Sequence, residues 1–207
     1  MRIKLCGFNE IESLETAIQH NCDFLGFIFV KNSVRNINYE QANSFAKIIP
    51  KNIAKVAVVL RASADHIEKI NNALKPDFFQ FHGDESVDDI LYFKEKYPNI
   101  KIIKAISVAT KNDLTQIKMF ENYIDYFLFD NKNPGSGNKF DWDLLTNVNT
   151  SKPWFLSGGI TADNIEEAII RTNAKLFDIS SGIEKIRGQK SNELIINLMR
   201  KFNSLKN

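Results

Sequence analysis

Two short segments near the C-terminus decide the fold: Trp154-Phe155-Leu156-Ser157-Gly158-Gly159 and Phe177-Asp178-Ile179-Ser180-Ser181-Gly182. Each begins with apolar residues typical of a buried strand and ends in a turn of small residues. A helical pattern over residues 160–171 separates them. Strand, turn, helix and strand form the unit from which parallel sheets are built, so we expect the carboxyl ends of these two strands to lie side by side.

Both turns are suited to binding an anion. Gly158 and Gly159 carry no side chain that would keep a ligand away from the backbone, so their amides can point outward. Ser180, Ser181 and Gly182 add hydroxyls and further open amides. Two such turns at adjacent strand ends indicate a phosphate site, and the loops after strands seven and eight are the usual phosphate site of a (β/α)8 barrel. The alternative interpretation is two tight turns without a ligand.

The rest of the chain repeats the same unit. The 207 residues divide into eight strand–loop–helix repeats of about 26 residues each. Besides the two strands above, apolar runs predict strands at residues 3–6, 24–30, 53–60, 77–82, 102–106 and 126–129. Eight βα units without a linker predict a single-domain (β/α)8 TIM barrel over residues 1–207. The alternative is an open doubly wound sheet, but its GxGxxG dinucleotide fingerprint is missing after the first strand.

Local signals place several helix ends. Asn9, Ser63 and Ser191 are each a suitable N-cap residue just before a helical pattern. Pro50 stops the helix expected over residues 39–49, and a short helix is expected at residues 141–145.

Composition narrows the class of protein. Hydrophobic residues make up 43% and charged residues 25%, and the net charge is +2. These values predict a soluble domain whose partners are neither nucleic acids nor membranes. Cys6 and Cys22 are the only cysteines, and without an export signal we expect reduced thiols in the cytoplasm. No CxxC or HxxxH spacing indicates a metal site, and we expect no cofactor.

Strand parity gathers polar side chains at one end of the predicted barrel. Ile3 and Leu5 should face the outer helices, which turns Lys4 and Cys6 inward. The same alternation turns His82 and Asp178 inward, and Asp130 follows the sixth strand. Each residue has a simpler interpretation as well. A lone cysteine such as Cys6 is usually a small buried hydrophobic residue, and we interpret Cys22 in that way. Asp130 could be a turn residue, and His82 could be part of a tight turn.

A thiol and a carboxylic acid across a barrel mouth provide a base and an acid for proton transfer. The sequence contains no metal, flavin or nicotinamide motif beside them. We therefore expect isomerisation or another redox-neutral reaction.

The sequence resembles the phosphoribosylanthranilate isomerases, the barrel enzymes of the tryptophan pathway. The resemblance runs in order from the first strand to the last, through residues 4–7, 25–29, 33–35, 80–85, 140–142, 157–161 and 178–184. The resemblance implies that Cys6 is the general base, that Asp130 is the general acid and that Arg35 holds the anthranilate carboxylate. Without the resemblance, Arg35 could be a solvated charge on a loop. We expect His82 and Asp178 to contact the substrate as well. The implied reaction is an Amadori rearrangement of N-(5-phosphoribosyl)anthranilate, and the implied assembly is a monomer or homodimer.

The chain departs from the family pattern in three places. Phe8-Asn9 follows Cys6-Gly7, and Val34 precedes Arg35 where a proline is common. The loop over residues 131–139, which flanks Asp130, is shorter than in many members.

Two other functions remain as alternatives. Another sugar-phosphate aldose–ketose isomerase on the same barrel would use two aspartates, whereas Cys6 stands on the first strand here. A catalytically silent phosphate-binding module would lack either Cys6 or Asp130, and both are present.

Overall fold

Eight parallel strands form a closed ring in the computed structural model, which describes residues 1–131, 141–146 and 148–206. The strands pair in chain order, and β1 closes the ring against β8. The strands are β1 Arg2–Cys6, β2 Phe24–Ile28, β3 Ala54–Val59, β4 Phe78–Phe81, β5 Lys101–Val108, β6 Tyr126–Asn131, β7 Trp154–Leu156 and β8 Leu176–Ile179. The predicted (β/α)8 barrel is therefore confirmed, and the open doubly wound sheet is wrong because that sheet would leave its edges unpaired.

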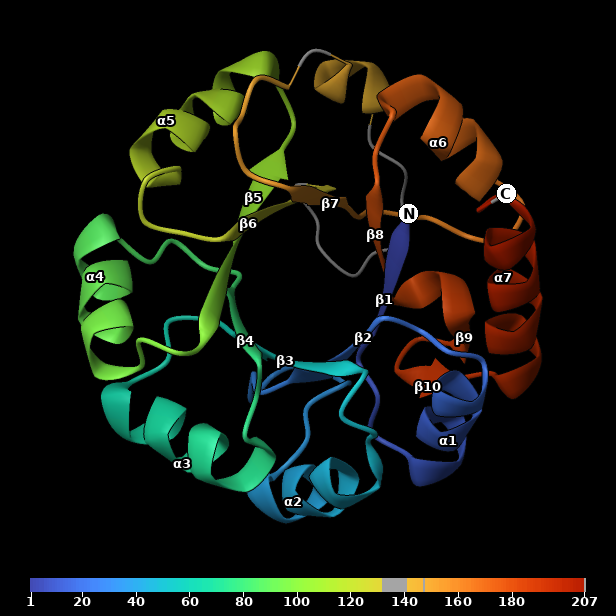
Figure 1. The fold of residues 1–207 in the computed structure, drawn as a ribbon, viewed down its shortest axis with the longest axis horizontal. Helices are drawn as coiled ribbons and strands as arrows, with labels where there is room; N and C mark the ends of the chain where they lie inside the picture. Colours follow the sequence, from blue (N-terminus) through green and yellow to red (C-terminus); the bar gives the residue numbers. More distant parts are fainter. Residues whose placement is uncertain (132–140, 147, 207) are drawn as a thin grey trace.

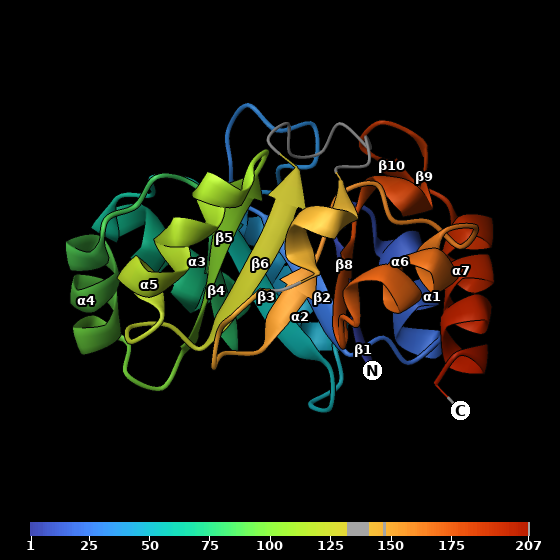
Figure 2. The ribbon, with the colours of Figure 1, turned by 90° about the horizontal axis from the view of Figure 1, so that it is seen from above.

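Helices surround the barrel (Figure 1). They are α1 Ile11–Gln19, α2 Tyr39–Ile48, α3 Ala64–Leu74, α4 Val87–Lys96, α5 Gln116–Phe120, α6 Ile165–Thr172 and α7 Asn192–Ser204, with short 3-10 turns at Lys111–Thr115, Trp142–Leu145 and Ser181–Ile183. Seen from the side, the arrowhead of β6 points to the end that carries the β9–β10 hairpin, and both termini are labelled toward the other end (Figure 2). This hairpin, β9 Glu184–Ile186 and β10 Gln189–Lys190, is antiparallel and lies outside the barrel.

The predicted strand parity is confirmed by two separate apolar cores. Ile3 and Leu5 are buried among the residues between strands and helices, as are their counterparts Phe79 and Phe81 on β4. Cys6 belongs instead to the core inside the barrel. Alternation along each strand therefore brings Cys6 into the interior, as the sequence predicted.

The helix ends show which N-cap residues can be predicted from the local sequence. Ser63 and Ser191 accept hydrogen bonds from the backbone as predicted N-caps. Asn9 does not cap α1: Glu10 is the N-cap residue, and the side-chain amide of Asn9 donates to the carbonyl of Gly188 on the hairpin turn. That contact joins segments 179 residues apart, so the sequence around Asn9 could not reveal it.

Two predicted helices differ from the observed ones. The helix expected over residues 160–171 begins only at Ile165, because the side chain of Asn164 accepts from the amide of Thr161 and holds a turn there. The short helix expected at residues 141–145 is a 3-10 turn over Trp142–Leu145. Its N-cap Asp141 accepts a hydrogen bond from the amide of Asp143.

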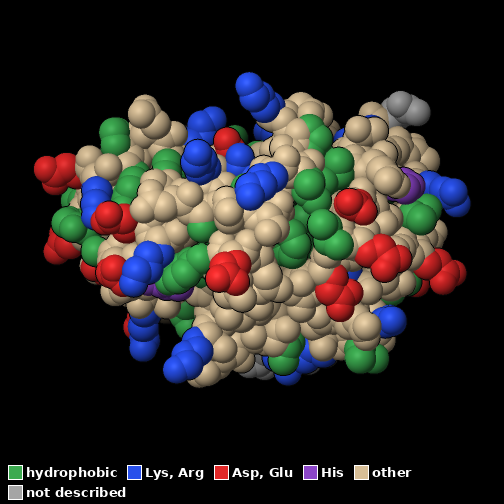
Figure 3. Space-filling model, turned by 90° about the horizontal axis from the view of Figure 1, so that it is seen from below, with side chains coloured by type: hydrophobic (Ala, Val, Ile, Leu, Met, Phe, Trp, Pro, Cys, Tyr) green, Lys and Arg blue, Asp and Glu red, His purple; other side chains and the backbone are tan. Residues whose placement is uncertain are grey.

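The side of the molecule seen in Figure 3 carries both basic and acidic side chains, with apolar side chains scattered between them. No helix in the described part of the chain is both long enough and apolar enough to cross a membrane.

Candidate active site

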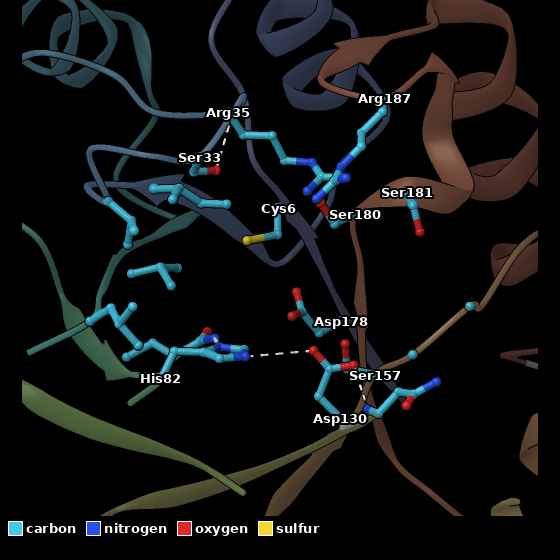
Figure 4. A pocket seen from close by; sticks show the side chains of 18 of the residues that line it. Cys6, Ser33, Arg35, His82, Asp130, Ser157, Asp178, Ser180, Ser181 and Arg187 are labelled. Atoms are coloured by element: carbon cyan, nitrogen blue, oxygen red, sulfur yellow. Dashed lines mark hydrogen bonds and ion pairs between the residues drawn. The ribbon is translucent and has the colours of Figure 1, made fainter. Parts of the chain in front are cut away.

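A cavity of about 320 Å³ opens at the carboxyl ends of the strands. A volume of this size suits a small-molecule ligand. Nine of the ten residues predicted for the site line it: Cys6, Arg35, His82, Asp130, Gly158, Gly159, Asp178, Ser180 and Ser181. In Figure 4, His82 and Asp130 lie on one side of this pocket, Arg35 and Arg187 lie on the other, and Cys6 lies between them.

Cys6 ends β1 with its thiol inside the barrel. The neighbouring residue on β2 is Gly26, and a Cβ there would come within 2.5 Å of the Cys6 sulfur, so glycine provides the space that the thiol occupies. Cys6 is only 4% exposed, and this burial raises the pKa of its thiol above the ordinary value. The Lys4 ammonium two residues earlier acts in the opposite direction and offsets part of the effect.

Asp130 lies at the end of β6, across the ring from Cys6. It is 6% exposed, and its Oδ1 accepts a hydrogen bond from the backbone amide of Asn131 at 2.8 Å. Its Oδ2 faces Nε2 of His82 at 3.6 Å, a contact drawn as a dashed line in Figure 4. Most of the loop that was predicted to flank Asp130 lies outside the described residues.

Arg35 is held by an ion pair that the sequence did not predict. Its Nε and Nη2 donate to the two carboxylate oxygens of Glu184 at 2.6 and 2.8 Å. Lys190 donates to the same carboxylate at 2.9 Å, and all three side chains are at most 5% exposed. Burial alone would raise the pKa of Glu184, but the bonds from Arg35 and Lys190 outweigh it and lower that pKa to about 2. Two cations and one anion leave this cluster with a net positive charge beside the cavity.

The first predicted phosphate turn has an open backbone. Gly158 and Gly159 have φ values of 90° and 69°, a region that side chains rarely occupy, so both positions require glycine. The side-chain amide of Asn164 donates through Nδ2 to the carbonyl of Gly159 at 2.9 Å. This bond stabilises the loop.

The second turn is fixed by the hairpin. Lys190 donates to the backbone carbonyl of Ser180 at 2.9 Å, while Ser180 and Ser181 line the cavity. Gly182 is the one predicted site residue that does not line it. A Cβ at Gly182 would lie 1.9 Å from the carbonyl oxygen of Ile160, so this glycine allows the second turn to pack against the first.

Five residues that line the cavity or support it were not among the predicted site residues, namely Lys4, Gln80, Glu184, Arg187 and Lys190. Strand parity had already turned Lys4 inward without giving it a role, and the same parity turns Gln80 inward; both side chains are fully buried. The other three belong to the β9–β10 hairpin or its ends. Among the residues that the structure describes, no group of three or more His, Cys, Asp or Glu side chains is placed to hold a metal ion.

Comparison with known proteins gives one consistent result. Residues 3–201 match the family model described as N-(5'-phosphoribosyl)anthranilate (PRA) isomerase. Curated relatives with the name N-(5'-phosphoribosyl)anthranilate isomerase include those of Parvibaculum lavamentivorans, 35% identical with 94% of each chain covered, and Sinorhizobium fredii, 38% identical with 94% of this chain and 90% of the relative covered.

Solved structures of phosphoribosyl anthranilate isomerases share the fold over nearly the whole chain. The protein from Thermotoga maritima superposes with a TM-score of 0.90 at 25% identity and 99% coverage of both chains. The protein from Thermus thermophilus gives a TM-score of 0.89 at 25% identity, with 99% of this chain and 100% of that chain covered. The chain belongs to the N-(5'-phosphoribosyl)anthranilate isomerase family.

Proposed function

We propose that this chain catalyses the Amadori rearrangement of N-(5-phosphoribosyl)anthranilate in tryptophan biosynthesis, with Cys6 as general base and Asp130 as general acid. The observation that carries the assignment of roles is the placement of these two side chains. They come from β1 and β6 and line one cavity, which is also lined by Arg35 and by the two turns of small residues. An acid and a base that flank a sugar ring provide the two proton transfers that an aldose–ketose isomerisation requires.

The reaction proceeds through a ring-opened intermediate. Asp130 protonates the furanose ring oxygen, and the C1–O bond breaks to give a Schiff base with the anthranilate nitrogen. Cys6 then removes the proton from C2, and the electron pair moves to form the enolamine. Tautomerisation gives the ketone 1-(2-carboxyphenylamino)-1-deoxyribulose 5-phosphate. No atom enters or leaves the substrate, so the reaction is redox-neutral.

The two ends of the substrate are bound at different parts of the cavity. We assign the phosphate to Gly158, Gly159, Ser180 and Ser181, with Gly182 in a packing role. The carboxylate is assigned to Arg35, whose Nη1 is not used in its hydrogen bonds to Glu184.

Arg187 is an additional cation at this end of the cavity. It lies on the turn of the β9–β10 hairpin, is exposed and lines the cavity, and has no ion-pair partner within the described part of the chain. We propose that it supports the binding of the carboxylate. Fixing both ends of the substrate places C2 at the thiol, and such positioning accounts for a large share of catalysis.

We assign further substrate contacts to His82 and Asp178, which both line the cavity. The small molecule is the only partner that the site requires. We place the reaction in the cytoplasm, where free thiols such as Cys6 and Cys22 persist. The predicted monomer or homodimer stays a prediction.

The alternative of another aldose–ketose isomerase is not favoured, because a thiol occupies the position where that enzyme would need a carboxylate. The experiment is to add purified protein to freshly prepared phosphoribosylanthranilate and follow the decay of its fluorescence. We expect the rate of decay to saturate with substrate concentration and to be proportional to enzyme concentration. A metal chelator should not change this rate. Decay no faster than the spontaneous rate would refute the proposed function, and a loss in chelator that added metal restores would refute the metal-free acid–base mechanism.

A further inference from the structure

A line of polar side chains runs from Asp178 to Asp130 along the lining of the cavity and passes through the fully buried Lys4. Lys4 Nζ donates to Asp178 Oδ1 at 2.9 Å and to Gln80 Oε1 at 2.8 Å. The other end of the same Gln80 amide, Nε2, lies 2.9 Å from Nδ1 of His82. The last link is the approach of His82 Nε2 to the Asp130 carboxylate at 3.6 Å.

Chemistry fixes the direction of each link. A lysine ammonium has donors only, so the atom of Gln80 that it contacts must be the carbonyl oxygen. Burial lowers the pKa of Lys4, but the Asp178 carboxylate more than offsets this, and the net direction is upward, so Lys4 carries its charge. The NH2 of Gln80 must then face His82 Nδ1, and because it donates, Nδ1 must accept.

A neutral imidazole that accepts at Nδ1 carries its proton on Nε2. That nitrogen is buried and has no hydrogen-bond partner within the described residues, although it points at Asp130. A distance of 3.6 Å is too long for a formed hydrogen bond but short enough to become one when a substrate closes the site.

We propose that Lys4 and Gln80 are positioning residues that set the tautomer of His82, so that His82 directs an N–H donor at Asp130. This role rests on the proposed function of Asp130 as general acid. After Asp130 has given its proton to the ring oxygen, the His82 N–H donates to the carboxylate that remains. A donor that is already oriented stabilises this charge without reorganisation during the reaction.

The tautomer is measured directly in the wild-type protein, independently of activity. The 15N and 1H spectrum of the imidazoles is recorded well above the ordinary histidine pKa of about 6.5, and His82 is assigned by the signal lost in His82→Gln. The chain contains a control: His20 Nδ1 lies 2.9 Å from the carbonyl of Thr16, so His20 should carry its proton on Nδ1. We expect Nε2–H for His82 and Nδ1–H for His20. An Nδ1–H tautomer at His82 would overturn the proposal, whether or not the protein proves to be an isomerase.

A double-mutant cycle tests the consequence for catalysis. Gln80→Met removes the donor that fixes Nδ1, and we expect kcat to fall by about ten- to a hundredfold with little change in KM, the range for losing a hydrogen bond to a charged group. The side-chain amide of His82→Gln provides an N–H near the position of Nε2 that does not depend on Gln80. Adding Gln80→Met to the His82→Gln variant should therefore lower kcat by less than about twofold. An equal loss in both backgrounds would mean that Gln80 acts only through packing, and would overturn its role.

Gln80→Glu is the matched variant for the direction of the bond. A carboxylate at this position still accepts from Lys4 but also accepts from Nδ1–H of His82, so the tautomer should reverse in the 15N spectrum while kcat falls. Retention of both the Nε2–H tautomer and full kcat in Gln80→Glu would contradict the proposal.

Discussion

Glu184→Gln is the substitution whose effect the structure defines most closely. The Glu184 carboxylate accepts four hydrogen bonds, from Arg35 Nε and Nη2, Lys190 Nζ and the amide of Gly188. Each oxygen accepts two of them. A glutamine has the same size, but whichever way its amide is turned, its NH2 group meets two donors and cannot accept from either. The substitution therefore leaves two buried cations without a counter-charge.

The magnitude follows from the pKa of Glu184. The bonds from Arg35 and Lys190 lower this pKa from 4.5 to about 2 against the opposing effect of burial. A difference of about 2.5 pH units between unfolded and folded states corresponds to roughly 3 kcal/mol of folding free energy. The Glu184 side chain is 3% exposed, so solvent screening reduces this value little.

The sign of the pH dependence follows from the same shift. Because the folded-state pKa is the lower one, the stabilisation is complete above the unfolded pKa of about 4.5 and is lost as the pH falls toward 2. The free energy of unfolding of the wild type should exceed that of Glu184→Gln by roughly 3 kcal/mol at pH 7 and by about half of that near pH 3.

The assay is urea unfolding of both proteins at several pH values, with equal m-values as the condition for comparing stabilities. Glu68→Gln is the matched control, because Glu68 pairs with Lys96 on the surface with both side chains more than a third exposed. Its cost should stay below about 1 kcal/mol. The ion-pair argument would be refuted if Glu184→Gln lost as little unfolding free energy as the control. It would also be refuted if that loss grew as the pH falls.

Three further predictions concern the cavity. Iodoacetamide should alkylate Cys6 faster as the pH rises toward the elevated pKa of its thiol, and a substrate analogue should protect Cys6. Cys22, whose pKa burial raises to about 12, should stay unmodified in mass spectra. Preferential labelling of Cys22 would contradict this prediction. Arg187→Ala should raise KM about tenfold with little change in kcat, while Lys185→Ala on the same hairpin changes neither; equal KM values for the two variants would exclude Arg187 from substrate binding. Ser181→Glu should weaken competitive inhibition by inorganic phosphate at least about tenfold at constant ionic strength, and unchanged inhibition would move the phosphate site elsewhere.

The barrel and its mouth were predictable because their signals are local. A strand of four or five residues alternates between two faces, so the inward direction of Cys6 and Asp178 followed from counting along the chain. The turn glycines were equally visible, since Gly158 and Gly159 adopt backbone angles that other residues rarely adopt.

The ion-pair cluster was not predictable for the opposite reason. Arg35 and Glu184 are 149 residues apart, and nothing in the sequence around either one shows that the β9–β10 hairpin brings them together. The hairpin itself has only two and three residues per strand, too short for a period of two to be recognised. Arg187 was missed because it lies on that hairpin. Gly182 was interpreted as a ligand-binding residue because small size suits both an open amide and close packing, and only the structure shows its contact with Ile160.

The central claim is that Cys6 is the general base of the rearrangement, and the turnover number of Cys6→Ala tests it most directly. Steady-state kinetics with phosphoribosylanthranilate should show a kcat at least about a hundredfold below wild type, the usual size of a general-base contribution, with KM nearly unchanged. Cys22→Ala, which removes the other buried thiol, should have wild-type kinetics. A Cys6→Ala protein that retains most of its kcat would contradict the account, because the thiol would then serve only to fill the space beside Gly26.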